Sequence, residues 1–329
     1  MRRELGRSDP GAAAGGRARP AWLAEAERGL DRLDGRGLVF LVGAPRSGTT
    51  WLQRLVASHP RVRTGQESGV FGGYLGPLLR TYREETRRRT RRGLAARPGV
   101  GLGAYLYEAD VVRAARLVVA QMLAAADVGP DETFLEKSPR HAKFLPEIWA
   151  VLPEARVVYI HRDPRDVIGS ILVASQSWGA DWAPPSPQGA VNKWARAVRA
   201  VRRARADAPP GQFVEVAYDE LKADPAAEAL RVVRALGLEW TAAEAEAAAA
   251  RNDASDVQAG DATPIPLYGP FRDHFGPVVE EPRGFAGGSR RGRGWRGLPR
   301  RTRALAWRYA RGLAAEEGYP AGFREWVLE

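Results

Sequence analysis

A short apolar run at residues 38–43 leads directly into a turn that carries Gly43, Pro45 and Gly48. A continuous apolar run of this length is typical of a strand buried in a parallel sheet. After the turn, apolar side chains recur at helical spacing from Trp51 onward. A strand, a glycine turn and a helix in this order form a cradle, because the N–H groups of the turn and of the helix N-terminus point at one anion. The segment therefore predicts an α/β fold with an anion-binding loop.

This loop departs from the nucleoside triphosphatase pattern G-x-x-x-x-G-K-[ST] at the lysine. Gly43 and Gly48 have the expected spacing, but Thr49 stands at the lysine position. The cation of the loop is Arg46, inside the turn. We therefore expect the loop to hold a single terminal phosphate and a group attached to it, with no nucleoside triphosphate and no obligatory Mg²⁺. A buried strand and turn without a ligand is the alternative.

The string P-R-S-G-T-T-W-L resembles the 5′-phosphosulfate loop of the sulfotransferase family, whose donor is 3′-phosphoadenosine 5′-phosphosulfate (PAPS). The resemblance implies a P-loop-like three-layer α/β/α domain with a central parallel sheet. It also implies that the loop holds the 5′-phosphate and the sulfonyl group, and that the tryptophan flanks the adenine. The matching residues are Arg46, Ser47, Gly48, Thr49, Thr50 and Trp51.

A second near-continuous apolar run, at residues 156–161, precedes the segment that begins at Arg162. Pro164 suits the first helical position, and Asp163 before it suits the N-cap. The segment is similar to the family's 3′-phosphate site, R-[DN]-P-[RK]-D-x-x-x-S, whose arginine and serine correspond to Arg162 and Ser170. A guanidinium fork and a hydroxyl satisfy a dianionic phosphate well. The order and distance of this motif after the cradle also match the family.

Two further segments resemble donor-binding elements of the family. The segment that begins at Tyr218 is similar to Y-E-D-L-x-x-D-P, whose tyrosine lines the adenosine site. Near the C-terminus, the chain resembles the element R-K-G…G-x-W-[KR] that closes over the 3′-phosphate, although Trp295 follows at a shorter spacing than in the cytosolic enzymes. The residues that match this last element are Arg290, Arg291 and Gly292.

The resemblance also implies the catalytic residues. H-P-x-V-R-x-G-x-E is similar to a segment of tyrosylprotein sulfotransferases and related bacterial enzymes, in which the glutamate is the general base; Glu67 is the match. E-K-[ST]-P resembles a motif whose lysine reaches the transferring group; Lys137 is the match, and Arg46 assists it. Cytosolic phenol and steroid sulfotransferases have a histidine base two places after the lysine, where this chain has Pro139, so the departure assigns the base to Glu67. His141 is expected to face the following helix.

Each of these assignments has a structural alternative. Glu67 could be a solvated loop acid, and Lys137 could be an exposed charge at a strand end. The arginine-rich run at residues 80–92 is typical of a solvated helical face, or could guide an acidic acceptor.

Composition limits the chemistry. The chain of 329 residues has no cysteine, which excludes disulfides, thiolate metal sites and a cysteine nucleophile. Its four histidines lack metal-ligand spacing, so no metal site is predicted. The net charge of +11 suits an anionic ligand or a polyanionic partner, although an arginine-rich composition explains most of it. No run approaches the ~18 apolar residues of a membrane span, and the N-terminus lacks a secretory signal, so we expect a cytoplasmic protein.

The predicted organisation is a low-complexity N-terminal region with a short helix at residues 1–35 and a single sulfotransferase domain at residues 36–329. Helices between Glu67 and the next strand are implied to shape the acceptor pocket. The Trp- and Pro-rich segment Trp178–Gln188 is expected to be a flap over that pocket, and residues 252–288 a long loop.

The sequence therefore predicts an enzyme that transfers the sulfonyl group of PAPS to an acceptor hydroxyl, or to an amine, and releases 3′,5′-ADP. The acceptor could be a small molecule, a glycan or lipid headgroup, or a peptide; nucleic acid is not expected. Two rivals remain: a P-loop-type nucleotide kinase or hydrolase, which ATP turnover would favour, and a non-catalytic polyanion-binding protein. Salt-sensitive nucleic-acid binding without PAPS turnover would favour the second rival.

Overall fold

The structure is a computed structural model, and it describes residues 29–30, 33, 37–92, 101–253, 262–279 and 294–329. Most of the predicted N-terminal region lies outside these residues. So do Arg290, Arg291 and Gly292, whose predicted role therefore stays a prediction.

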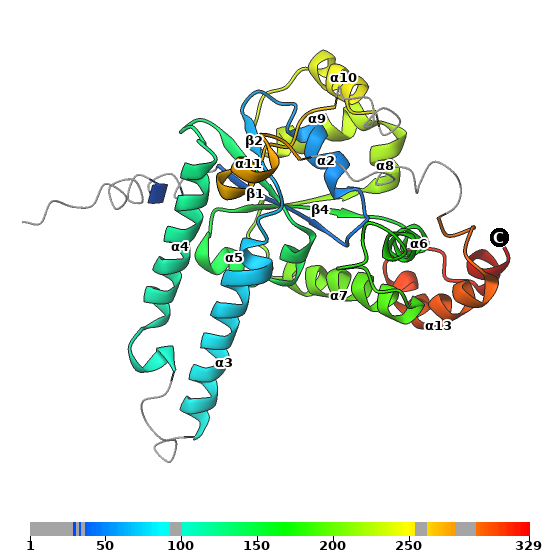
Figure 1. Cartoon of the computed structure of the whole chain (residues 1–329), viewed down its shortest axis with the longest axis horizontal. Helices are drawn as coiled ribbons and strands as arrows, with labels where there is room; N and C mark the ends of the chain where they lie inside the picture. The colour runs from blue at the N-terminus through cyan, green and yellow to red at the C-terminus, as the bar shows by residue number, and fades with distance from the viewer. Residues whose placement is uncertain (1–28, 31–32, 34–36, 93–100, 254–261, 280–293) are drawn as a thin grey trace, which may run out of the picture.

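A parallel sheet forms the centre of the described part of the chain, with its five strands in the order β2-β3-β1-β4-β5 (Figure 1). The apolar run at residues 38–43 is the middle strand and is buried along its whole length, as predicted. The strands are β1 (Leu38–Gly43), β2 (Val62–Thr64), β3 (Thr133–Lys137), β4 (Arg156–His161) and β5 (Phe213–Ala217).

Alternate side chains of the strands enter two separate cores, because successive residues of a strand point to opposite faces. Phe40 and Val42 belong to one core, whereas Val39 and Leu41 belong to the other. One face is covered by α2 (Thr49–Val56), α8 (Tyr218–Ala223), α9 (Pro225–Ala235) and α10 (Ala242–Arg251). The other is covered by α5 (Leu145–Val151), α6 (Pro164–Ser175), α7 (Pro187–Arg205) and α13 (Arg300–Glu316). This arrangement confirms the predicted three-layer α/β/α fold.

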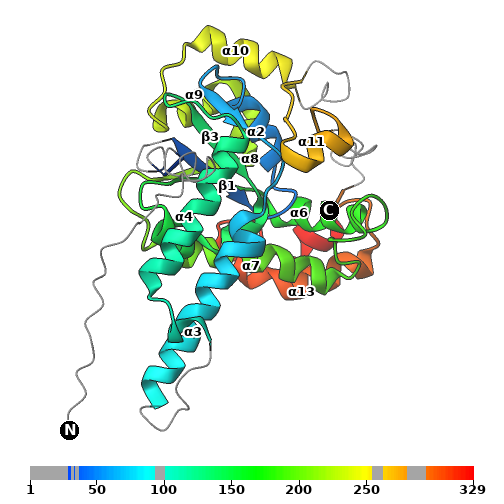
Figure 2. The ribbon, with the colours of Figure 1, turned by 60° about the vertical axis from the view of Figure 1, so that its left-hand side comes forward.

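Two long helices, α3 (Gly76–Arg92) and α4 (Glu108–Ala125), extend side by side away from the sheet (Figures 1 and 2). Their sheet-proximal parts enter the core through residues such as Leu79 and Leu123. Farther out, the Tyr82 hydroxyl donates to the Leu106 carbonyl at 2.9 Å. Short helical turns flank the pair: η1 (Val70–Leu75) precedes α3, and η3 (Leu102–Ala104) precedes α4.

Lys137 is the last residue of β3, and the turn η4 (Pro139–Lys143) separates this strand from α5, which begins at Leu145. The prediction of one long loop at residues 252–288 was wrong for its described part, which contains α11 (Gly269–Phe275) and a β-bridge between Pro266 and Val278. The Gly- and Pro-rich composition does not reveal this pairing, because the segment is held by contacts with the distant chain after β2, such as the hydrogen bond from the Gln66 N–H to the Pro266 carbonyl.

The C-terminal part packs against the helix that carries Ser170. Trp295 is buried; its indole N–H donates to the Trp326 carbonyl at 2.8 Å, and the two rings lie edge to face with centroids 5.1 Å apart. Trp326 belongs to the last element, η5 (Arg324–Leu328). A Cβ added to Gly169 of α6 would lie 2.8 Å from the backbone nitrogen of Trp295. The backbone at Trp295 therefore passes directly over the residue before Ser170.

The Gly169→Ala substitution should destabilise the protein by about 1–3 kcal/mol, because the added methyl group meets backbone that cannot move aside. The matched control is Gly312→Ala in α13, where a Cβ meets nothing within 4 Å. The control should be neutral or stabilising by up to about 1 kcal/mol, since alanine favours helix. Denaturant unfolding measures both changes. Equal stabilities for the two variants would show that Trp295 does not pack on α6.

Candidate active site

The predicted site residues follow the carboxyl ends of the strands. Arg46 comes after β1, Glu67 after β2, Lys137 ends β3, Arg162 follows β4, and Tyr218 follows β5. Because all these strands are parallel, their carboxyl ends meet at one edge of the sheet. Ligands of open α/β sheets bind at this edge. The fold thus gathers residues that are up to 172 positions apart in the sequence, from 46 to 218.

The turn after β1 has the backbone geometry of an anion cradle. Arg46 and Gly48 both have left-handed backbone conformations, with φ of 75° and 102°. Gly48 is required here, because a Cβ would lie 2.5 Å from the Tyr218 ring. Gly48 is also the N-cap of α2 and provides no side-chain cap for the first N–H groups of that helix. The Ser47 hydroxyl is buried and has no hydrogen-bond partner among the described residues. These features fit a group with several oxygen acceptors, such as a phosphate.

Arg46 joins this cradle to α6. Its Nε donates a hydrogen bond to the Ser170 hydroxyl at 2.9 Å, across 124 positions of sequence. Its guanidinium carbon lies 5.0 Å from the centroid of the Trp178 ring. The two segments predicted to hold opposite ends of the donor are therefore in direct contact. Trp178 also places the beginning of the expected flap beside the cradle.

Trp51, Tyr218 and Arg162 form a column of flat side chains next to the cradle. The Trp51 and Tyr218 rings lie edge to face with centroids 5.8 Å apart, and the Arg162 guanidinium carbon is 4.0 Å from the Tyr218 centroid. The Trp51 indole N–H donates to the Asn252 carbonyl at 2.8 Å. Arg162 also forms an ion pair with Asp166, one helical turn along α6, at 2.9 Å. The column combines aromatic surface with a cation, as an adenosine phosphate requires.

Glu67 and Lys137 form an ion pair with the Lys137 Nζ and the Glu67 Oε1 2.5 Å apart. The lysine side chain is buried, at 7% exposure, whereas the glutamate side chain is 47% exposed. Lys137 is therefore not the exposed strand-end charge that the sequence left as an alternative. Glu67 is the partner that a molecule in solution can reach.

A buried polar network, which sequence reasoning missed, anchors the segment that carries Glu67. The Glu136 side chain is only 1% exposed, and its Oε1 accepts hydrogen bonds from the Ser68 hydroxyl at 2.8 Å and from His141 Nε2 at 3.0 Å. His141 Nδ1 accepts the Gly72 backbone N–H at 3.0 Å, so these bonds assign the ring proton to Nε2. The expectation that His141 faces the following helix was wrong. Both ring nitrogens form hydrogen bonds in the core, where the imidazole packs edge to face against the Phe40 and Phe71 rings.

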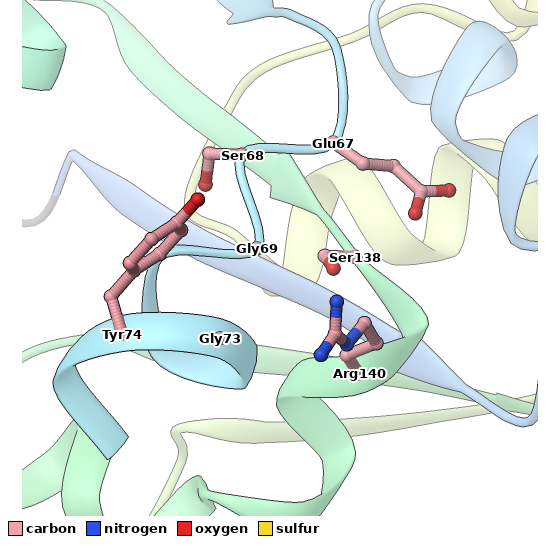
Figure 3. A pocket seen from close by; sticks show the side chains of 7 residues that line it. All are labelled: Glu67, Ser68, Gly69, Gly73, Tyr74, Ser138 and Arg140. Atoms are coloured by element: carbon pink, nitrogen blue, oxygen red, sulfur yellow. The ribbon is translucent and has the colours of Figure 1, made fainter. Parts of the chain in front are cut away.

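A pocket opens beside the Glu67–Lys137 pair (Figure 3). Its volume is about 360 Å³. Part of its wall comes from the chain that follows Glu67, including Tyr74 of η1, and part from the chain that follows Lys137. The lining residues are Glu67, Ser68, Gly69, Gly73, Tyr74, Ser138 and Arg140. Of the elements between Glu67 and the next strand, η1 lines this pocket, whereas α3 and α4 are not part of its lining.

His161, at the end of β4, is a neutral neighbour of the cationic Arg162. Burial lowers the pKa of His161, and nearby carboxylates, Glu215 first, oppose this effect only in part. Its Nδ1 lies 2.5 Å from the hydroxyl of Tyr319, whose pKa is raised by burial. The imidazole is therefore uncharged at pH 7, so the positive charge at this strand end comes from Arg162.

Within the described ranges, no group of three or more His, Asp or Glu side chains is arranged to hold a metal ion. Over the same residues, no helix combines the length and the apolar character that crossing a bilayer requires.

The profile of the sulfotransferase family matches residues 39–242 of this chain. The chain belongs to the sulfotransferase family. A putative protein-tyrosine sulfotransferase of Caenorhabditis briggsae is 25% identical over 205 residues, which are 62% of this chain and 66% of that protein. A protein-tyrosine sulfotransferase of Drosophila melanogaster is 25% identical over 208 residues, or 62% of this chain and 38% of that protein. The chain thus spans less than two thirds of the length of these relatives.

A solved structure of this family shares the fold. The sulfotransferase domain of the olefin synthase of Synechococcus PCC 7002 aligns with a TM-score of 0.50 at 17% identity. The alignment covers 86% of this chain and 95% of that domain. The resemblance of the sequence motifs to sulfotransferases is thereby confirmed at the level of family and fold.

The Glu136→Ala substitution should lower the free energy of unfolding by about 2–4 kcal/mol, because it leaves buried donors of His141 and Ser68 without their acceptor. Glu108→Ala is the matched control, since Glu108 is a half-exposed carboxylate paired with Arg83 on the outer helices. The control should change stability by less than about 1 kcal/mol. Chemical denaturation measures both. Similar losses in the two variants would contradict the anchoring role of Glu136.

Proposed function

We propose that this protein transfers the sulfonyl group of PAPS to an acceptor hydroxyl and releases 3′,5′-ADP. The observation that carries the proposal is the 2.9 Å hydrogen bond between Arg46 and Ser170. It joins a phosphate cradle without the P-loop lysine to a second site suited to a phosphate. A nucleotide with phosphates at both its 3′ and 5′ positions is the ligand that would use both. Membership of the sulfotransferase family supports the same donor.

Different residues at the carboxyl edge of the sheet bind different parts of the donor. The N–H groups at the start of α2, with the hydroxyls of Ser47, Thr49 and Thr50, hold the 5′-phosphosulfate, which supplies the activated sulfonyl group when bound. The unpartnered Ser47 hydroxyl would gain an acceptor there. Trp51 and Tyr218 flank the adenosine. Arg162 and Ser170 hold the 3′-phosphate, and the segment with Arg290, Arg291 and Gly292 completes this contact.

Glu67 is the general base in this proposal. It takes the proton of the acceptor hydroxyl as the acceptor oxygen bonds to sulfur and the bond from sulfur to the bridging oxygen breaks. The half-exposed position of its carboxylate lets an acceptor reach it. When the donor binds, the Lys137 ammonium leaves Glu67 and donates to the oxygens of the transferring group. Together with Arg46 it stabilises the negative charge that develops on those oxygens. The leaving group is 3′,5′-ADP, which keeps the bridging oxygen and its negative charge, while Glu67 keeps the proton.

The pocket beside Glu67 receives the acceptor. Two relatives are protein-tyrosine sulfotransferases by name, so a phenolic hydroxyl is one acceptor chemistry to test. A small molecule, a glycan or lipid headgroup, and an amine are the others. The volume of about 360 Å³ suits a small molecule or a single projecting side chain.

Wild-type protein should bind 3′,5′-ADP more tightly than 5′-AMP, and Arg162→Ala should remove about 10- to 100-fold of the affinity for 3′,5′-ADP alone. The reason is the lost charge-assisted contact to the 3′-phosphate. Thermal shift and calorimetry measure both nucleotides. Arg202→Ala serves as the control, because Arg202 of α7 forms a solvent-exposed ion pair with Glu316 of α13. Equal losses for the two nucleotides would place the 3′-phosphate elsewhere, and no binding of either would contradict the proposed function.

Glu67→Gln should lower turnover by about 10²- to 10⁴-fold, the usual contribution of a positioned base, while binding of 3′,5′-ADP changes little. Transfer of labelled sulfate from PAPS into a panel of hydroxyl compounds measures turnover. The control Glu132→Gln changes a carboxylate just before β3, whose Oε1 pairs with Arg63, and should retain activity. Undiminished turnover in Glu67→Gln would remove Glu67 from this role.

A further inference from the structure

The proposed acceptor pocket contains a cation, Arg140, that has no acidic partner among the described residues. Arg140 is exposed and lines the pocket, and no ion pair, hydrogen bond or ring contact joins its guanidinium to another of the described residues. The nearby Arg80, by contrast, pairs with Glu147 at 3.0 Å. Figure 3 shows the Arg140 guanidinium directed toward the strand end with Ser138, while Tyr74 and Glu67 lie on opposite sides of the view. The N–H donors of such an unpaired guanidinium are available to a ligand in the pocket.

A second polar group of the same pocket also lacks a partner. The Ser138 residue is 1% exposed, and within the described part of the chain its hydroxyl makes no hydrogen bond. An unsatisfied buried hydroxyl is costly, so such groups in native proteins call for an explanation such as a bound ligand. Ser138 follows Lys137 directly and precedes Arg140 by two positions. The hydroxyl and the guanidinium therefore flank one part of the pocket wall.

Cations also gather behind this wall, where η4 packs against α7. Burial, followed by the charges of Arg196 and Arg140, lowers the pKa of Lys143. The pKa of Lys193 is lowered by burial first and then by Lys143, Arg140 and Arg196. Four cations thus influence one another in this region, and their mutual repulsion makes an anion near Arg140 favourable.

We propose that Ser138 and Arg140 form a subsite for a carboxylate on the acceptor, so that this enzyme acts on small hydroxy acids. This inference rests on the proposed function, because it needs an acceptor hydroxyl placed at Glu67. The planar fork of an arginine matches the two oxygens of a carboxylate. Glu67 already places a negative charge at one part of the pocket, so the carboxylate lies at the Arg140 end and the hydroxyl at the Glu67 end. The exposed Tyr74 ring adds apolar surface to the same pocket for the carbon skeleton.

The test compares hydroxy acids with their own methyl esters, which remove the charge and keep the skeleton. The probes are 4-hydroxyphenylacetate and 6-hydroxyhexanoate with their esters, titrated by calorimetry into the full chain with and without saturating 3′,5′-ADP. At least one acid should bind wild-type protein about 10-fold or more tightly than its ester, the usual size of a hydrogen bond to a charged group. Arg140→Gln should abolish this preference and leave 3′,5′-ADP binding unchanged, and Ser138→Ala should reduce the preference in part. The control Arg113→Gln, on the outer face of α4, should keep it, since Arg113 is 69% exposed and pairs with Asp110.

Three outcomes would contradict the proposed subsite: equal binding of acids and esters to the wild type, no binding of any acid, or an equal loss of acid and ester affinity in Arg140→Gln. The last result would assign Arg140 to the fold or to the donor. A failure of 3′,5′-ADP to bind counts against the proposed function instead. Normal 3′,5′-ADP binding without any preference for acids counts against the subsite alone.

Discussion

The hydrogen bond from Arg46 to Ser170 is the contact on which the candidate site depends. It connects the turn after the central strand to a helix that follows the neighbouring strand, at 2.9 Å. Arg46 keeps a left-handed backbone conformation, which a residue with a Cβ adopts at a cost. Such a conformation persists where the surroundings hold it, and here the Ser170 hydroxyl and the Trp178 ring hold the side chain. The cradle and the predicted 3′-phosphate site are thereby kept at one distance from each other.

Strand β3 serves the site through both of its faces. Successive residues of a strand point in opposite directions, so Lys137 reaches Glu67 at the ligand edge while Glu136 enters the core. The core carboxylate then bonds back to Ser68, directly after Glu67. Both side chains of the ion pair are thus tied to the same strand, one directly and one through its neighbour. A site supported in this way by packed elements is better ordered than one supported by loops alone.

The net charge of the chain does not by itself locate a binding surface. Many arginines have acidic partners in the structure: Arg83 pairs with Glu108, Arg202 with Glu316, and Arg231 with Glu228. Exposed ion pairs of this kind contribute little to the free energy of folding. They also attract anionic ligands only weakly, because the two charges offset each other. Arg140 differs in having no such partner among the described residues and in facing a pocket. The position of an unpaired cation therefore carries more functional information than the total of +11.

The sequence by itself determined the strands at residues 38–43 and 156–161, the helix that begins at Pro164 and the family. These features are encoded by neighbouring residues, through apolar runs, a proline and an aspartate at a helix start, and short motifs. Only the tertiary structure decided the partners of Glu136 and His141, the lack of a partner for Arg140 among the described residues, and the β-bridge on either side of α11. Each of these depends on which distant segments pack together, since Glu136 lies 68 positions from Ser68. The periodicity of apolar residues and the spacing of motifs depend on local geometry. The role of a buried polar group depends on hydrogen-bond partners that only the fold brings to it.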